Sequence, residues 1–150
     1  MLKTMRGLIF VGVFGLTAIA LGNAAGCSYG WAIGEGDLIG RGIGTTMMVA
    51  RLLHKLGTDE QKAEILTPAL RGEIIICLGF TEPGSGSDVA AAQTKAVRDG
   101  DEWVIDGQKM FTTNAHIGDY VFLVARTNPD VPKHKGLTTF LVPLKHPGVE

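Results

Sequence analysis

The 150-residue sequence has few of the residues that build metal sites or disulfide frameworks. Its two cysteines, Cys27 and Cys77, lie far apart without a CxxC spacing, and its four histidines show no HExxH spacing. The GxGxxG and GxxxxGK[ST] phosphate loops are also missing, and Ser85 and Ser87 have no recognisable His and Asp companions in the sequence. We therefore expect no metal site, no disulfide framework and no serine hydrolase.

Charge is scarce and almost balanced. The formal net charge is −1, and lysines and arginines do not cluster with aromatic residues. Proteins that bind nucleic acid usually carry a basic patch, so this class of partner is not expected. An apolar content of 45% and a charged content of 19% are typical of a globular domain.

No charged residue lies between Arg6 and Glu35. Inside this gap, residues 7–22 (GLIFVGVFGLTAIALG) form an apolar run. A basic start, an apolar run and the small residues before Cys27 resemble a secretory or lipoprotein signal. The alternative is a buried or wrongly assigned start of the chain. We assign residues 1–26 as an apolar leader, through which membrane contact is possible.

Residues from about 36 to 72 have the pattern of helices. Met48, Leu52 and Leu53 recur at helical spacing, and Gly57 is a typical end of a helix. Thr58 and Gln61 then have the spacing of a capping box, which predicts a second helix directly afterwards.

The period changes to that of strands from Ile74 onward. The run IIICLGF (74–80) predicts a buried strand, and Asp99-Gly100 predicts a hairpin turn. Two further strands are predicted in DYVFLVAR (119–126) and KGLTTFLVPL (135–144). Because the strands are short and close together, we predict an α+β protein with a small antiparallel β-barrel.

The loop TEPGSGSD (81–88) follows the first strand directly. Gly84 and Gly86 permit backbone conformations in which several N–H groups converge on an anion, although an ordinary glycine turn has the same composition. Ser87 and Asp88 are predicted to cap a short helix over VAAAQ. Glu82 and Asp88 are interpreted as residues that cap or tie the loop rather than as an acid–base pair.

The sequence from CLGFTEPGSGSD through DGQKMFTTN to VFLVART resembles the middle region of the acyl-CoA dehydrogenases, whose motifs are TEPGxGSD and NGxKxxITN. The resemblance covers roughly Gly42 to Glu150. It implies that residues 27–73 are a remnant of a helical N-terminal domain and that residues 74–150 are a β-barrel middle domain. It also implies that the C-terminal helical domain is absent and that the chain is a fragment.

The resemblance implies that FAD is the cofactor. Backbone groups around Leu78 and Phe80 would meet the polar edge of the flavin, and the Thr81 hydroxyl would bond near N1 and O2. Gly86 and Ser87 would lie at the pyrophosphate, and Ser87 would also contact the acyl-CoA substrate.

The second motif, FTTN, stands where the family has WITN. Phe111 would replace the usual tryptophan against the flavin, Thr112 would adjoin the cofactor, and Thr113 would meet flavin N5.

The implied reaction is α,β-dehydrogenation of an acyl-CoA to the trans-enoyl-CoA, with a glutamate as base and an electron-transfer flavoprotein as electron acceptor. The family's catalytic glutamate lies in the C-terminal helical domain, and no glutamate of this chain maps onto it. These glutamates are Glu35, Glu60, Glu64, Glu73, Glu82, Glu102 and Glu150. We therefore expect the chain to be inactive alone and to act in a homo- or hetero-oligomer.

The expected location is cytoplasmic, or membrane-associated or exported if the leader is genuine. The alternative function is a membrane-tethered, non-catalytic module that binds FAD or a CoA ester.

Overall fold

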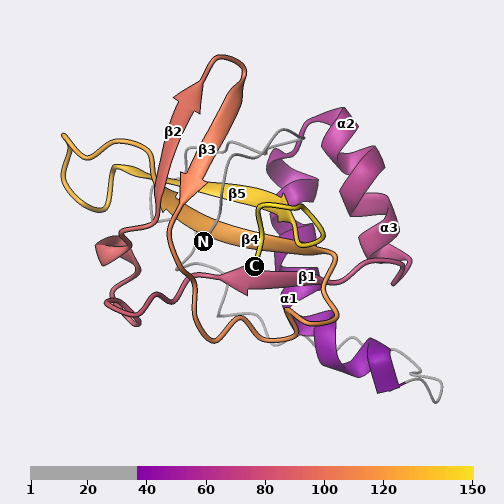
Figure 1. Ribbon diagram of the computed structural model, residues 1–150. Coiled ribbons are helices and arrows are strands. Elements are labelled where there is room, and N and C mark those ends of the chain that lie inside the picture. Colours follow the sequence, from indigo (N-terminus) through magenta and orange to yellow (C-terminus); the bar gives the residue numbers. More distant parts are fainter. Residues whose placement is uncertain (1–36) are drawn as a thin grey trace.

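The computed structural model describes residues 37–150, so the predicted leader lies outside the described residues. Within residues 37–150, no helix combines the length and the apolar character needed to cross a membrane. Figure 1 shows the helices gathered at one end of a twisted sheet.

The helices form from the segments predicted to be helical. α1 (Asp37–Leu56) ends before Gly57, where a Cβ atom would lie 2.6 Å from the Leu53 carbonyl oxygen. The capping box is confirmed, because the Gln61 N–H donates to Thr58 Oγ1 at 3.3 Å and the Thr58 N–H donates to Gln61 Oε1 at 2.8 Å. The second helix is divided into α2 (Asp59–Gln61), a π-helical turn η3 (Lys62–Leu66) and α3 (Thr67–Leu70).

The sheet is built around β4. Its strands are β1 (Ile76–Gly79), β2 (Lys95–Asp99), β3 (Glu102–Asp106), β4 (Tyr120–Arg126) and β5 (Leu137–Pro143). β5 pairs antiparallel with β4 along its whole length. β1 and the first residue of β2 pair parallel with the beginning and the end of β4, and β3 is antiparallel to β2.

The α+β class is confirmed, but the sheet is mixed and, within the described residues, open rather than a closed antiparallel barrel. β1 reaches β4 through a long crossover instead of a hairpin. The Asp119 carboxylate accepts the Ile75 N–H at 2.9 Å, and the Ile75 carbonyl accepts the N–H groups of Asp119 and Tyr120. These bonds fix β1 in parallel beside the start of β4.

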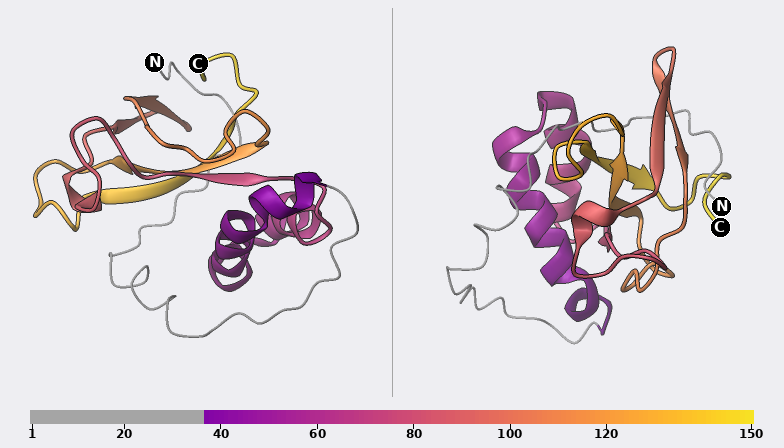
Figure 2. Two further views of the ribbon diagram at one scale, coloured as in Figure 1. Left: turned by 90° about the horizontal axis from the view of Figure 1, so that it is seen from below. Right: turned by 90° about the vertical axis from the view of Figure 1, so that its left-hand side faces the viewer.

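One face of the sheet packs against the helices, as the edge-on view in Figure 2 shows. Ile76, Phe122 and Leu141 from the sheet form one core cluster with Leu53 and Ile65 from the helices. All five are side chains that lose almost all of their contact with water, which is the main force that holds helix to sheet.

The β2–β3 hairpin folds over the opposite face. Ala96 and Ile105 of the hairpin join Leu123 and Phe140 in a second core cluster. Trp103 packs edge-on against Phe140 with ring centroids 5.4 Å apart. Residues 80–94 connect β1 to this hairpin, so the predicted loop TEPGSGSD lies at the end of the sheet away from the helices.

Candidate functional site

The loop 81–88 begins with a tight turn. Glu82 and Ser85 exchange two backbone hydrogen bonds, Glu82 N–H to Ser85 O at 2.8 Å and Ser85 N–H to Glu82 O at 3.1 Å. Among the described residues, the N–H groups of Gly86 and Ser87 have no backbone acceptor, and both residues are exposed. The Ser85 hydroxyl is buried without a hydrogen-bond partner in this part of the chain.

The predicted cap by Asp88 is wrong. Val89–Ala91 form a single 3₁₀ turn (η4), and the side chain of Asp88 makes no capping hydrogen bond to it. Instead, Lys133 Nζ donates to the Asp88 carboxylate at 2.6 Å, and this bond lowers the pKa of Asp88. The carboxylate therefore ties the loop to residues 127–136, as the loop-tying interpretation predicted.

The second motif lies directly beside the first. The Met110 N–H donates to the Thr81 carbonyl oxygen at 2.8 Å, which joins residues 107–114 to the start of the TEPGSGSD loop. The fold thus brings the two motifs together, although Thr81 and Met110 are 29 positions apart in the sequence.

Phe111 has an unusual conformation and exposure for a large apolar residue. Its φ angle is 55°, in the left-handed region that bulky side chains rarely adopt, and its side chain is 82% exposed. Asn114 is also left-handed, with φ 67°. Non-glycine residues in this region cost free energy and cluster at functional sites.

Three threonines lie near Phe111. Thr112 and Thr113 follow it in the sequence, and Thr81 is hydrogen-bonded to the preceding residue, Met110. Thr81 and Thr112 are half-buried and Thr113 is exposed. Their hydroxyl groups form no hydrogen bond with any residue from 37 to 150. These hydroxyls therefore remain available to donate or accept.

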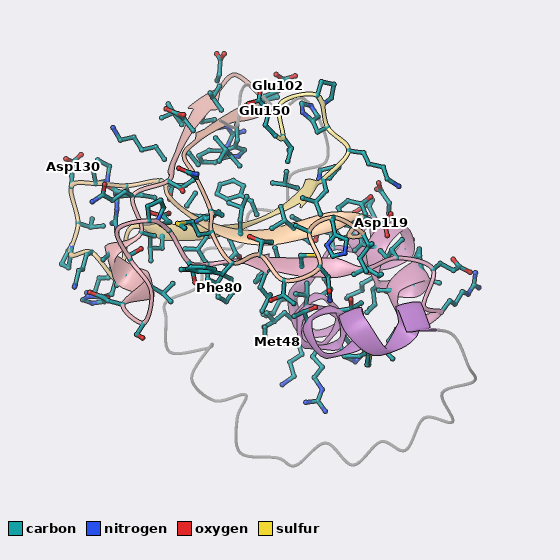
Figure 3. The ribbon with its side chains drawn as sticks, turned by 60° about the horizontal axis from the view of Figure 1, so that its bottom comes forward. Met48, Phe80, Glu102, Asp119, Asp130 and Glu150 are labelled. Atoms are coloured by element: carbon teal, nitrogen blue, oxygen red, sulfur yellow. The ribbon has the colours of Figure 1, made fainter. Side chains whose placement is uncertain are left out.

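The side chains of Leu78 and Phe80 do not reach this surface. They pack against the core cluster on the helix face, where the rings of Phe80 and Phe122 have centroids 6.1 Å apart. Phe80 is labelled in Figure 3. In the described part of the sheet, β1 pairs only with β4, so its other edge carries no neighbouring strand. A ligand contact by these two residues would therefore use their backbone, and that contact stays a prediction.

A buried ion pair between Glu82 and Lys109 was missed by the sequence analysis. Lys109 Nζ lies 2.7 Å from Glu82 Oε1, and the side chains are 7% and 5% exposed for Lys109 and Glu82 respectively. The lysine belongs to the second motif, but nothing in its neighbours indicates that it is buried.

The ionisation of both groups follows from this contact. Burial raises the pKa of Glu82, but hydrogen bonds from Lys109 and from the backbone N–H groups of Gln93 and Thr94 outweigh it and lower the pKa to about 2. Burial lowers the pKa of Lys109, and the Glu82 carboxylate acts against this change.

Arg126, at the end of β4, is a second residue that the sequence did not indicate. Its guanidinium donates to the carbonyl oxygens of Ala90 at 2.6 Å and Ala92 at 3.1 Å. A third bond, at 3.2 Å, goes to the carbonyl oxygen of Lys133. Arg126 therefore holds η4 and the loop before β5 against the sheet.

Two hollows flank Gly107 and Gln108. One, of about 330 Å³, is lined by Lys109, Thr112, Val121 and Leu123 among others. The other, of about 340 Å³, is lined mainly by polar residues. These are Glu82, Gln93, Thr94, Lys95, Asp106 and Gln108, together with Pro83, Gly84 and Gly107.

Comparison with known proteins identifies the family. The family model described as "Acyl-CoA dehydrogenase, middle domain" matches residues 77–150. The chain belongs to the acyl-CoA dehydrogenase family. The members it resembles are flavoprotein oxidoreductases of lipid degradation.

Among relatives of this acyl-CoA dehydrogenase chain, FadE29 of Mycobacterium tuberculosis is 44% identical over 69% of this chain and 27% of its own length. The solved structure of the Tcur3481–Tcur3483 steroid acyl-CoA dehydrogenase is 49% identical, with a TM-score of 0.65 over 66% of this chain and 26% of that one. A glutaryl-CoA dehydrogenase from Mycobacterium smegmatis, solved with FADH2, is 36% identical, with a TM-score of 0.58 over 66% of this chain and 24% of that one. The chain thus spans about a quarter of the length of these relatives.

Proposed function

We propose that this chain supplies the flavin-facing middle domain of an FAD-dependent acyl-CoA dehydrogenase. The observation that carries the proposal is Phe111, an 82% exposed aromatic residue in a left-handed conformation, joined through the Met110–Thr81 bond to the TEPGSGSD loop. An exposed aromatic face is a favourable stacking surface for a planar ring system. Strained backbone at such a residue is typical of a site where ligand contact offsets the strain.

The groups around Phe111 fit the polar parts of FAD. The free hydroxyls of Thr81 and Thr113 suit the heteroatoms of a flavin ring, with Thr112 beside them. The N–H groups of Gly86 and Ser87 suit a pyrophosphate, and the buried, unpartnered Ser85 hydroxyl is a group whose desolvation a ligand would offset. Bound FAD would supply the acceptor for the hydride that leaves the β-carbon of the acyl-CoA.

The base that removes the α-proton is proposed to come from outside the glutamates of this chain. Glu82 is the glutamate within the two motifs, and Lys109 and two backbone N–H groups hold it ionised with a pKa of about 2. Such a carboxylate is a weak base. Its hydrogen bonds to three donors also keep it from approaching the proton of a substrate. We therefore propose that the base belongs to a longer or second chain in an oligomer.

The remaining partners follow from the same proposal. Ser87 would adjoin the acyl-CoA, and an electron-transfer flavoprotein would reoxidise the cofactor in the cytoplasm. The names of two solved relatives refer to different substrates, a steroid in one and glutaryl-CoA in the other. The proposal therefore extends to acyl-CoA esters as a class and not to one acyl chain.

Titration of the purified chain with FAD, followed by flavin fluorescence, tests the proposal. Phe111→Ala removes the exposed ring and should weaken FAD binding by about tenfold, the equivalent of one lost stacking contact. Val97→Ala is the matched control, because Val97 is also an exposed apolar residue, 61% exposed, on the β2–β3 hairpin. Equal affinities for the two variants, or no binding by the unchanged chain, would contradict the proposal.

A further inference from the structure

We propose that the Glu82–Lys109 ion pair is a positioning device that sets the two motifs of the site relative to each other. The inference rests on the proposed function, because the groups so positioned are the ones assigned to FAD. It adds a role for two residues to which the proposed function assigns no contact with the cofactor or the substrate.

The carboxylate of Glu82 accepts hydrogen bonds from three donors on two other segments of the chain. Oε1 accepts from Lys109 Nζ at 2.7 Å and from the Thr94 N–H at 3.0 Å, and Oε2 accepts from the Gln93 N–H at 2.6 Å. One side chain thereby links the TEPGSGSD loop to the start of β2 and to the second motif.

The side-chain pair stands next to a backbone hydrogen bond. Thr81 precedes Glu82, and Met110 follows Lys109, so the Met110 N–H···O=C Thr81 bond of 2.8 Å is adjacent to the ion pair. Two neighbouring links resist rotation of one segment against the other, which a single link does not. Phe111 follows directly, and its orientation is therefore fixed relative to Thr81.

The surroundings of Lys109 are shaped to accept its stem. A Cβ atom on Gly79 would lie 3.5 Å from Lys109 Cγ and only 2.9 Å from Val121 Cγ2. The lysine stem therefore packs beside β1 at ordinary van der Waals distance, and Val121 is the neighbour that leaves no room for a side chain at Gly79.

A buried ion pair is weak evidence for a gain in stability. Desolvation of two charges can exceed their attraction, and apolar or neutral replacements of both are often tolerated. Since each of the two motifs carries one of the two charges, a role in geometry explains the pair better than a role in stability.

The test compares three forms of the full chain with the unchanged one. Lys109→Met leaves Glu82 buried without its cation and should lower the denaturation midpoint strongly. Glu82→Gln with Lys109→Met removes both charges, keeps an amide oxygen as acceptor, and should recover most of that midpoint. Asp88→Asn with Lys133→Met removes the exposed pair of the same loop and serves as the matched control.

Two measurements distinguish a positioning role of the ion pair from a stabilising role. In the Glu82→Gln/Lys109→Met double variant, hydrogen exchange of the Met110 amide should be about tenfold faster than in the unchanged chain, and FAD affinity about tenfold weaker. The amides of β4 should be unaffected, as should both readouts in the Asp88/Lys133 control.

The outcomes distinguish this inference from the proposed function. If the unchanged chain binds FAD and the double variant matches it in affinity and in Met110 exchange, the positioning role is overturned while the proposed function stands. If the unchanged chain does not bind FAD, the proposed function fails, and the Met110 exchange rate alone decides whether the pair fixes the junction. Unchanged exchange in the double variant overturns the role in either case.

Discussion

Glu82 is the residue whose charge the site depends on most. Its carboxylate is buried, accepts hydrogen bonds from three donors, and stays ionised because Lys109 is one of them. Since the pKa falls from 4.5 to about 2, the folded state binds this proton less tightly than the unfolded chain does. By linkage, the ionised form of Glu82 contributes stability of about 3 kcal/mol above the unfolded pKa.

The free energy of unfolding should therefore depend on pH through Glu82. Its contribution is fully present above pH ~5 and is lost as the pH falls through ~4.5 toward ~2, because the pKa is lowered on folding. Urea denaturation of the unchanged chain and of Glu82→Gln should show a difference at neutral pH that shrinks steadily on acidification. A difference that is constant from pH 7 to pH 2 would show that Glu82 does not titrate as the structure requires.

At this scale the sequence predicted the residues that belong to motifs and missed those that act through tertiary contacts. Phe111, Thr81 and Thr113 were located because the motif text resembles the family, although their contacts to FAD stay predictions. Lys109 and Arg126 were missed because a lysine or arginine reveals its carboxylate or carbonyl partners only when distant segments are brought together.

At the scale of elements, one hydroxyl connects the first helix to the sheet. Thr46, on the inner side of α1, accepts the buried Ile76 N–H on Oγ1 at 2.9 Å. Ile76 begins β1, so this bond fixes the position of α1 relative to β1, the strand that leads into the site.

Thr46→Val should remove this bond while keeping the shape of the side chain. The Ile76 N–H would then be buried without an acceptor, which costs about 1–3 kcal/mol. Thr46→Ser keeps the hydroxyl and should lose less, so the two variants form a pair in chemical denaturation. Equal losses would mean that the methyl group, and not the hydroxyl, makes the contribution.

Local signals predicted the elements that depend on neighbouring residues. The capping box at Thr58 and the hairpin turn after Asp99 are confirmed, the latter with Gly100 at φ 60° and Asp99 paired with Glu102. The parallel pairing of β1 with β4 was not predicted, because Asp119 and Ile75 determine it across a long crossover. The same distance effect explains the failed helix cap at Asp88, whose carboxylate is engaged by Lys133.

For the molecule as a whole, β4 is the strand on which the other parts depend. It has helices on one face and the β2–β3 hairpin on the other, and its residues from Val121 to Ala125 are buried. β3, by contrast, pairs only with β2 among the described strands and keeps most of its residues in partial contact with water.

Amide hydrogen exchange should reflect this difference. The amides of β4 that bond to β5 are expected to exchange only when the whole domain unfolds, and those of β3 through local opening at a much lower free energy. Mass spectrometry or NMR of the exchanging chain measures both. Protection of β3 equal to that of β4 would contradict the view that the hairpin is the less stable part.

The crossover between β1 and β4 also has a consequence for biosynthesis. Ile75 and Asp119 are hydrogen-bonded although they are 44 positions apart, so β1 leaves the ribosome well before the strand that pairs with it. At bacterial or eukaryotic elongation rates, β1 then remains without its partner strand for a few seconds. Unpaired apolar strands tend to aggregate during such a period. The nascent chain should therefore need a chaperone most in the interval before β4 emerges.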